Sequence, residues 1–402
     1  MHEGKNIIQR PLYLDRVIPF IGKNLIKVFT GQRRVGKSYF LYQLMGYITA
    51  EDRDAHIISI NKEDLSFSHI KNADDLHGYV KSNMRTSANN YVFIDEIQDI
   101  ENFPMALRSL MLIDNVELFC TGSNANLLST DVVGNLSGRY IEIQIYSLTY
   151  TEFLIFHSLK DSDDALDKYL KYGGLPYLKH LPLNDEIIFE YLKNIYSSVI
   201  YRDVINRYSI RNSGFLEQLV LFLAQHTGSL FSAKKISDYL KSQGIKVSSL
   251  QVQRYLEYLK NAFLVHKVPR YDIKGKRMFE FGEKIYFENI GIRNGIWGYR
   301  LEDKGKILEN AVYNHLLTKN FKLSVGKIGH NEIDFVAEKQ GETNYYQVSL
   351  RLTETKTINR ELGNLEKIEN NYPKTLVTFD KYTGASHGGI QIINIRDFLS
   401  DL

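Results

Sequence analysis

The chain has 402 residues with a formal net charge of +3, and 44% of its residues are hydrophobic and 24% charged. This length exceeds what one hydrophobic core usually organises, so we expect roughly two to four domains, and so small a net charge does not by itself indicate a nucleic-acid partner. The single cysteine, Cys120, excludes a disulfide framework and favours the reducing cytoplasm. We expect neither a membrane span nor a secretory signal, because no apolar run reaches ~18 residues and residues 1–10 lack an apolar stretch.

The first motif lies at residues 31–38, between an apolar, strand-like run at 25–29 and an amphipathic helical run at 39–45. It reads G-Q-R-R-V-G-K-S, a full match to the phosphate-binding pattern G-x-x-x-x-G-K-[ST]. Its glycines let successive backbone N–H groups face phosphate oxygens, and the N-terminus of the following helix favours an anion. Lys37 adds a positive charge and the Ser38 hydroxyl suits Mg²⁺, so the motif predicts binding of ATP with Mg²⁺. The predicted nucleotide-binding residues are consecutive: Gly31, Gln32, Arg33, Arg34, Val35, Gly36, Lys37, Ser38 and Tyr39.

A second apolar run, residues 91–94, ends in two carboxylates, Asp95 and Glu96, about sixty residues beyond the loop. This order is typical of the Walker B strand of an ATPase. We expect Asp95 to hold Mg²⁺ together with Ser38, and Glu96 to orient or deprotonate the attacking water.

Polar residues also accompany the next two expected strands. The strand at 116–120 runs into T-G-S-N, where Ser123 is the first candidate for contact with the γ-phosphate or the attacking water, and Asn124 is the second. A cap on the helical segment that follows explains these two residues equally well. Arg139 precedes the alternating strand at 141–145, where the γ-phosphate of a neighbouring subunit would need a cation, and a solvated surface arginine is the alternative.

Four motifs together resemble those of AAA+ ATPases: the phosphate loop, the Asp-Glu strand end, T-G-S-N at 121–124 and S-G-R-Y at 137–140. More narrowly, the chain resembles the archaeal and bacterial AAA+ ATPases that carry a C-terminal nuclease-like domain. G-G-L-P at 173–176 resembles a signature in the helical lid of that family, and I-Y-R-D-V at 200–204 resembles the helix after the lid. The resemblance implies a ring in which Arg139 acts on the neighbour's nucleotide, and a lid that carries the hydrolysis state outward.

Beyond the lid, three helical segments at 215–225, 232–241 and 248–262 precede an extended, basic segment at 263–287. Capped helices joined by a turn and followed by a hairpin predict a winged helix. In the DNA-binding use of that fold, the third helix enters a groove and the hairpin contacts phosphates. The expected DNA contacts are Gln251, Arg254 and Lys260 on the helix and Lys267, Arg270, Lys274, Lys276 and Arg277 on the hairpin.

Winged helices also dock proteins, so a protein partner is the alternative for this segment. The hairpin carries six basic side chains, the five just named and Lys284. This local concentration of positive charge favours DNA.

The segment from 291 to 402 is expected to form a helix, three strands, a helix and two strands, an order that resembles nucleases of the PD-(D/E)xK type. Glu309, Asp334 and the triplet Gln347-Val348-Ser349 fall where the metal-binding acids and the lysine of such a site would be. A working site needs roughly two or three acids for a divalent cation and a lysine near the attacked phosphate. Because Gln347 replaces an acid and Ser349 replaces the lysine, we expect a degenerate domain that does not cut and is kept for DNA or protein contacts.

The sequence thus predicts an α/β protein in four parts: a P-loop AAA+ core at 1–146, a helical lid at 147–211, a winged helix at 212–290 and a nuclease-like domain at 291–402. We expect a cytoplasmic ATPase that assembles into a ring, by analogy a hexamer, and uses hydrolysis to remodel or move along duplex or branched DNA. A nucleotide-controlled switch that binds a protein partner is the alternative. An ATP-dependent nuclease is a third hypothesis, which the residues at 347 and 349 weaken.

Overall fold

The computed structural model divides into two compact units, one of Met1–Tyr146 with Asn261–Phe263 and the other of Ser147–Lys260 with Leu264–Leu402. Residues are described at 7–128, 136, 138–351, 355–380 and 386–401. Every helix among them is too short or too polar to cross a bilayer. Short 3₁₀ helices lie at Ile18–Phe20, Leu65–Phe67, Ile97–Asp99, Ala125–Leu128, Pro176–His180 and Leu301–Asp303.

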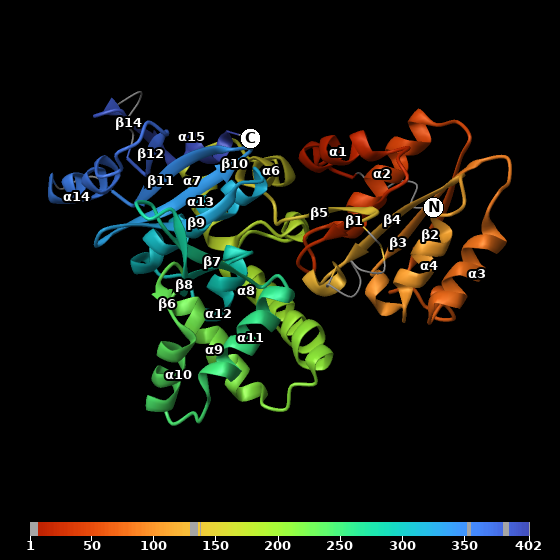
Figure 1. Ribbon diagram of the computed structural model, residues 1–402, viewed down its shortest axis with the longest axis horizontal. Helices are drawn as coiled ribbons and strands as arrows, with labels where there is room; N and C mark the ends of the chain where they lie inside the picture. The colour runs from red at the N-terminus through yellow and green to blue at the C-terminus, as the bar shows by residue number, and fades with distance from the viewer. Residues whose placement is uncertain (1–6, 129–135, 137, 352–354, 381–385, 402) are drawn as a thin grey trace. The chain divides into compact units, whose positions relative to one another are not determined.

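The first unit is built around a parallel sheet (Figure 1). Its strands are β1 Ile26–Thr30, β2 Ala55–Asn61, β3 Asn89–Asp95, β4 Val116–Gly122 and β5 Tyr140–Gln144. Among the described residues, their order is β2-β3-β4-β1-β5, so β4 separates the strand before the phosphate loop from the strand that carries the carboxylates. Because both faces are covered, β1 and β3 are buried along almost their whole length and consist of nearly continuous apolar runs.

Helices cover both faces of this sheet, and their bounds are α1 Pro11–Val17, α2 Lys37–Glu51, α3 Ala73–Asn83 and α4 Phe103–Leu110. Val28 of β1 shares one core with side chains of α3 and α4. Phe29, the next residue, points to the opposite face and lies 5.1 Å from Phe40 of α2, measured between ring centroids. Tyr13 of α1 lies on that same side, 6.0 Å from Phe40. The alternation along β1 therefore places α2, which follows the phosphate loop, against the sheet.

The second unit begins with the helices α6 Tyr150–His157, α7 Asp163–Tyr172 and α8 Asp185–Ser198, a π-helical turn at Val199–Asn206, and later α12 Ile290–Trp297. The sequence predicts one helix across 185–207 and does not predict α12, which is short and contains Gly291 and Gly295. Gly291 is a packing position, because a Cβ there would lie 1.9 Å from the carbonyl oxygen of Tyr172. A Cβ on Gly173 would lie 2.5 Å from the amide nitrogen of Gly291. The G-G-L-P motif therefore begins where two backbone segments touch.

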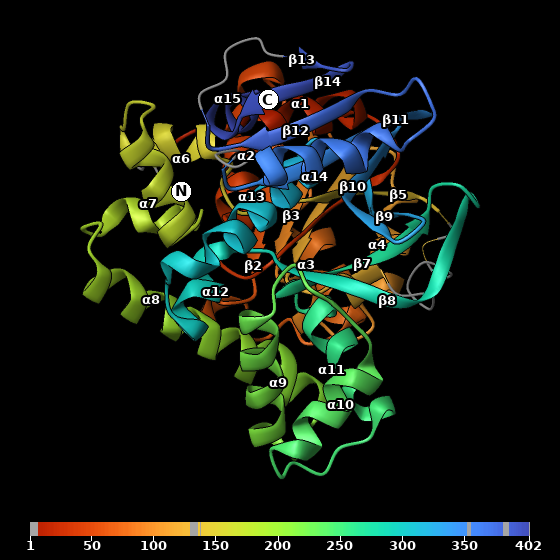
Figure 2. The ribbon, with the colours of Figure 1, turned by 90° about the vertical axis from the view of Figure 1, so that its left-hand side faces the viewer.

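Three helices and a long hairpin follow: α9 Ser213–Gln225, β6 Leu230–Phe231, α10 Ala233–Ser242, α11 Ser249–Asn261, β7 Val265–Asp272 and β8 Arg277–Phe287. Figure 2 shows α9, α10 and α11 gathered beneath the hairpin. Ser232 caps α10 by accepting from the backbone N–H of Lys235, which is the type of start that the sequence predicts. Strand β8 pairs antiparallel with both β7 and β6. The two-residue strand β6 is too short for periodicity to reveal.

The same sheet continues into the C-terminal segment, whose elements are α13 Lys304–Thr318, β9 Lys322–Ile328, β10 Asn331–Lys339, β11 Glu342–Ser349, α14 Thr355–Glu366, β12 Lys374–Thr378, β13 Ser386–His387, β14 Ile390–Asn394 and α15 Ile395–Ser400. Within the described ranges, nine strands follow in the order β13-β14-β12-β11-β10-β9-β7-β8-β6. Helix α13 packs on one face with Phe335 and Ala337 of β10, and α14 packs on the other with Ile333 and Val336. Because β7 pairs in parallel with β9, one sheet runs across residue 290, and the limits of four domains stay a prediction.

Candidate functional site

The phosphate loop joins the end of β1 to the start of α2, and its backbone requires glycine at two positions. At Gly31, φ is +146° and a Cβ would lie 2.2 Å from the carbonyl oxygen of Ile145. At Gly36, which precedes α2, φ is +99°, a region that residues with a side chain rarely adopt. Arg34 is also left-handed, with φ at +71°. The glycines of the sequence pattern are thus required by the local geometry.

Lys37 and Ser38 begin α2 and face the interior of the loop. Lys37 is buried, and its ammonium donates to the backbone carbonyls of Gly31 at 3.0 Å and Gln32 at 3.1 Å. The side chain of Ser38 is hydrogen-bonded to Asp95. The two residues predicted to bind Mg²⁺ therefore lie together, although they belong to different parts of the sequence.

The two carboxylates at the end of β3 are held by a hydroxyl of the neighbouring strand β4. Thr121 donates its hydroxyl to Asp95 Oδ1 and accepts from the backbone N–H of Glu96, the latter at 2.9 Å. Glu96 is left-handed, with φ at +55° and ψ at +52°. Such a conformation costs about 1–3 kcal/mol for a residue with a side chain and is held by its surroundings. Sequence reasoning did not single out Thr121, although it begins the T-G-S-N motif.

The carboxylate of Glu96 is buried and is oriented by two donors. The hydroxyl of Ser123 donates to Glu96 Oε2 at 3.0 Å, and the side-chain amide of Gln98 donates to the same oxygen. Asn124 is also buried, directly after Ser123. The structure therefore places Ser123 in contact with the predicted base. Gln98 was missed because its role depends on the turn that brings it back to Glu96, and a lone glutamine carries no spacing signal.

The pKa values of the two carboxylates shift in opposite directions, although the positive charge of Lys37 lowers both. Burial would raise the pKa of Glu96, but the positive charges of Lys37 and Arg33 and the two donors outweigh it and lower that pKa below its usual value. Burial dominates at Asp95, whose pKa is raised despite hydrogen bonds from Ser38 and Thr121. Glu96 is therefore held as an anion that can accept a proton or orient a water.

Arg33 is buried and forms an ion pair of 3.2 Å with Glu63, in the connection between β2 and α3. Glu63 was not predicted, because nothing in its local sequence distinguishes it from other exposed glutamates. The pair fixes one of the two cations that act on Glu96.

The side chain of Gln32 indicates that the loop has room for the contacts of a ligand. Its side chain is fully buried, and within the described part of the chain neither its amide nitrogen nor its amide oxygen has a hydrogen-bond partner. An unpaired buried amide costs free energy. Such a group in a phosphate loop is therefore consistent with a loop whose hydrogen bonds are completed when a ligand binds. Lys37, Ser38 and Asp95 supply the cation and the oxygen ligands that a nucleotide with Mg²⁺ needs.

Arg139 is exposed and lies just before β5. Its carbonyl accepts from the backbone N–H of Ile26, the first residue of β1, at 3.0 Å. The phosphate loop follows Thr30, at the other end of β1. Because β1 has five residues and a strand rises about 3.3 Å per residue, Arg139 starts from the end of the sheet opposite to the loop of its own chain.

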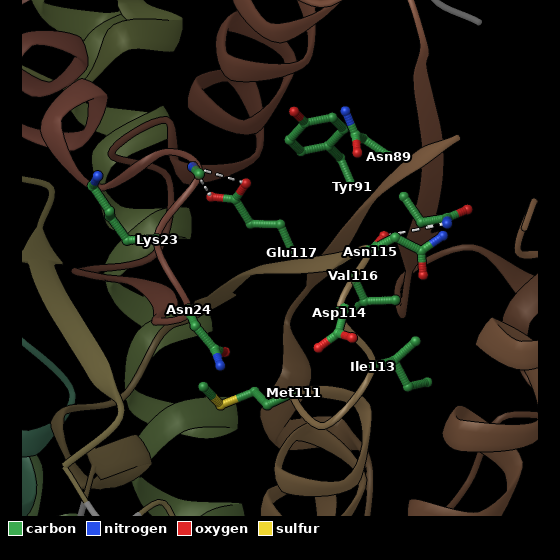
Figure 3. A pocket seen from close by; sticks show the side chains of 12 residues that line it. Lys23, Asn24, Asn89, Tyr91, Met111, Ile113, Asp114, Asn115, Val116 and Glu117 are labelled. Atoms are coloured by element: carbon green, nitrogen blue, oxygen red, sulfur yellow. Dashed lines mark hydrogen bonds between the residues drawn. The ribbon is translucent and has the colours of Figure 1, made fainter. Parts of the chain in front are cut away.

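A polar pocket of about 360 Å³ opens at that opposite end, and residues at 22–24, 89–91, 111 and 113–117 line it. The carboxylate of Glu117, labelled in Figure 3, accepts from the backbone N–H of Gly22 with both of its oxygens at 3.1 Å. Glu117 also forms an ion pair with the buried Lys27. The pocket contains none of the predicted site residues, and the polar groups just named are paired with one another.

The side chains predicted to contact DNA fall into exposed and paired groups. Arg254, Lys274, Lys276 and Arg277 are exposed, as is Lys260, which lies 3.5 Å from Glu257. Gln251 and Arg270 are half-buried. Lys267 forms ion pairs with Glu257 at 2.6 Å and Glu283 at 3.2 Å. Lys284 is 2% exposed, which corrects the expectation of six solvent-facing cations on the hairpin.

The residues predicted for a degenerate metal site lie close together in the nine-stranded sheet. Gln347 accepts from the backbone N–H of Asp334 at 3.3 Å and donates to Glu361 at 2.9 Å. Glu309 is not adjacent to them in sequence but is joined to Asp334 through Lys284, which contacts both carboxylates. Burial alone would lower the pKa of Lys284, but the neighbouring negative charges raise it well above its usual value.

Residues 23–154 match the family model of an AAA domain. Together with the phosphate loop, the strand order and the paired carboxylates, this match shows that the chain is a P-loop ATPase of the AAA+ type. Residues 163–303 match a domain of unknown function, DUF8612.

The chain belongs to the same family as an uncharacterized protein of Haemophilus influenzae, to which it is 34% identical over 404 residues, covering 98% of this chain and 99% of that protein. An uncharacterized protein of Methanocaldococcus jannaschii is 31% identical over 362 residues, covering 86% of this chain and 78% of that protein. Among solved structures, a Walker-type ATPase of Pyrococcus abyssi superposes with a TM-score of 0.50 at 14% identity, covering 72% of this chain and 95% of that one. At this identity, the comparison with the Pyrococcus abyssi ATPase shows similarity of fold alone.

Proposed function

We propose that the chain couples ATP hydrolysis to the binding and remodelling of duplex or branched DNA, as a ring oligomer and by analogy a hexamer. The observation that carries the hydrolytic part is Glu96, a buried carboxylate kept ionised beside Lys37. Lys37 and the loop N–H groups bind the β- and γ-phosphates, and Ser38 with Asp95 holds Mg²⁺, which neutralises phosphate charge when bound. Glu96 orients the attacking water and accepts its proton, and Ser123 keeps the carboxylate in place.

The DNA part rests on helices α9 to α11 and strands β6 to β8. Three helices followed by a hairpin, with a short strand that pairs with β8, support our proposal of a winged helix. Lys274, Lys276 and Arg277 are exposed around the hairpin turn, and Arg254 is exposed on α11. The hairpin turn is therefore the part of this segment best suited to DNA phosphates.

The double variant Lys274→Ala with Lys276→Ala is expected to weaken duplex binding about tenfold and to lower the slope of log affinity against log salt by about two, because two phosphate contacts are lost. Fluorescence anisotropy over a range of salt concentrations measures both quantities. The matched control is Lys71→Ala with Lys81→Ala, which removes the same charge from exposed sites in the first unit. Equal losses in both double variants would show that the hairpin makes no specific contact.

A nucleotide-controlled switch that binds a protein partner is the second candidate. Two observations favour it: Lys267 is paired with two glutamates, and Lys284 is buried. The hairpin therefore presents less positive charge to a DNA phosphate than its six basic residues predict. The ATPase rate with and without duplex, single-stranded and junction DNA separates the two. Stimulation by DNA supports the first function, and an unchanged slow rate supports the switch.

Lys37→Ala is expected to weaken ATP binding at least ~10-fold, because it removes a charge-assisted contact that is typically worth about 1.5–3 kcal/mol. Isothermal titration calorimetry with ATP and Mg²⁺ measures the affinity. Lys62→Ala is the matched control, since Lys62 is another lysine of this unit that donates to backbone carbonyls, those of Phe67 and Ile70. An unchanged affinity in Lys37→Ala would move the nucleotide to another site.

We also propose that the C-terminal segment is a nuclease-like fold that does not cut DNA, and that the protein acts in the cytoplasm. The support for the location is the single cysteine. Cys120 lies inside β4, and burial raises the pKa of its thiol to about 12, so it is not a reactive thiolate.

A further inference from the structure

The ammonium of Lys284 lies among three carboxylates in the second unit, where β8 meets α13 and β10. It is 2.7 Å from Glu309 Oε1, 2.8 Å from Glu332 Oε1 and 3.2 Å from Asp334 Oδ1. The ammonium donates hydrogen bonds to Glu309 and Asp334 and forms an ion pair with Glu332. The three acids come from a helix and from two positions on one strand, and they converge on the single lysine of β8.

The groups around this cluster orient the carboxylates toward that point. Tyr286 donates its hydroxyl to Glu309 Oε1 at 2.5 Å. The backbone N–H of Val348 donates to Asp334 Oδ2 at 2.9 Å, leaving Oδ1 for the lysine. A Cβ on Gly228 would lie 3.3 Å from the Glu309 carboxylate, so the backbone packs closely on that side.

We propose that these three carboxylates form a site with the ligands of a divalent-cation centre, and that the chain fills it permanently with the ammonium of Lys284. Converging carboxylate oxygens are what Mg²⁺, Mn²⁺ and Ca²⁺ bind. Carboxylates this close together repel one another unless a cation compensates them, and Lys284 supplies that cation from within the chain. The C-terminal sheet therefore needs no metal, and the ion cluster ties the β7–β8 hairpin to α13 and β10. Nothing in this cluster depends on the nucleotide site, which lies in the other unit.

Lys284→Ala is expected to lower the melting temperature of the full chain by roughly 10 °C, and millimolar Mn²⁺ is expected to restore a large part of that loss. Wild-type protein should show no such shift with Mn²⁺, because its site is filled. The measurement is thermal unfolding without nucleotide, with Mn²⁺, Mg²⁺ and Ca²⁺ tested separately. Adding Asp334→Asn to Lys284→Ala should abolish the recovery, since one of the ligands is then neutral.

Lys267→Ala is the matched control, because Lys267 lies on the neighbouring strand β7 and also pairs with two glutamates, but outside the cluster. Its loss of stability should not respond to Mn²⁺. Lys284→Met provides a second variant that keeps the length of the side chain and removes its charge. If Lys284→Ala is recovered unfolded, Lys284→Met is prepared with and without Mn²⁺. The amount of Mn²⁺ bound per chain at equilibrium is then compared with that of wild type.

Two results would overturn the proposal. One is that neither variant at position 284 gains stability or bound Mn²⁺ over wild type, including failure of both to fold in Mn²⁺. The other is that wild-type protein nicks plasmid DNA with Mg²⁺ or Mn²⁺ and Asp334→Asn does not, because a cutting site must hold the metal that Lys284 is proposed to replace.

Discussion

Glu96→Gln should bind ATP with nearly wild-type affinity and hydrolyse it about 10²–10⁴-fold more slowly, the range typical for removal of a general base. The amide keeps the shape of the side chain and can still accept from Ser123 and Gln98, so the site should stay assembled. It cannot carry the negative charge that Lys37 and Arg33 stabilise at this position. A single-turnover rate with excess enzyme, together with a direct affinity measurement, isolates the chemical step.

The matched control for this change is Glu101→Gln, because Glu101 is an exposed glutamate that also lies between β3 and α4. It should leave both quantities unchanged. A single-turnover rate for Glu96→Gln within a factor of a few of wild type would assign the role of base to another residue.

Arg139→Ala should lose about 10³-fold in hydrolysis, the lower end for arginine fingers, while retaining ATP binding. We expect this effect to act between subunits. Arg139 precedes Tyr140, and Tyr140 pairs with Ile26, the first residue of β1. The phosphate loop follows Thr30, the last residue of β1. An arginine at that end of the sheet starts away from its own nucleotide, and we propose that it serves a neighbour in a ring.

Mixing Arg139→Ala with Lys37→Ala subunits tests this directly, because the first supplies an intact pocket and the second an intact arginine. If the two variants, each impaired alone, recover activity together, the site is shared between subunits. No recovery in mixed rings identified by native mass spectrometry would remove Arg139 from the role. Wild-type protein that stays monomeric with ATP and DNA would favour the switch.

The parts of the site that sequence predicts well are those in which one short segment fixes its own geometry. The loop at 31–38 has its glycines where φ is positive or a Cβ would clash, and Asp95 ends a buried strand as the apolar run before it indicates. Contact of Ser123 with the γ-phosphate or the water was predicted with a helix cap as an equal alternative, and this choice stays a prediction. The bond of Ser123 to Glu96 could not be predicted, because it depends on β4 lying beside β3.

What the sequence by itself determined is the class of chemistry: a phosphate loop, an acid pair after a buried strand, and an α/β chain with helices between the strands of its first part. Each of these depends on contiguous residues whose conformation follows from local backbone preferences and hydrophobic periodicity. Only the tertiary structure decided that Thr121 and Gln98 hold Glu96, that Lys284 is buried among carboxylates, and that one sheet crosses residue 290. Those contacts join residues that the register of paired strands or a single turn brings together. A charged side chain in the sequence carries no mark of whether it will meet solvent or three carboxylates.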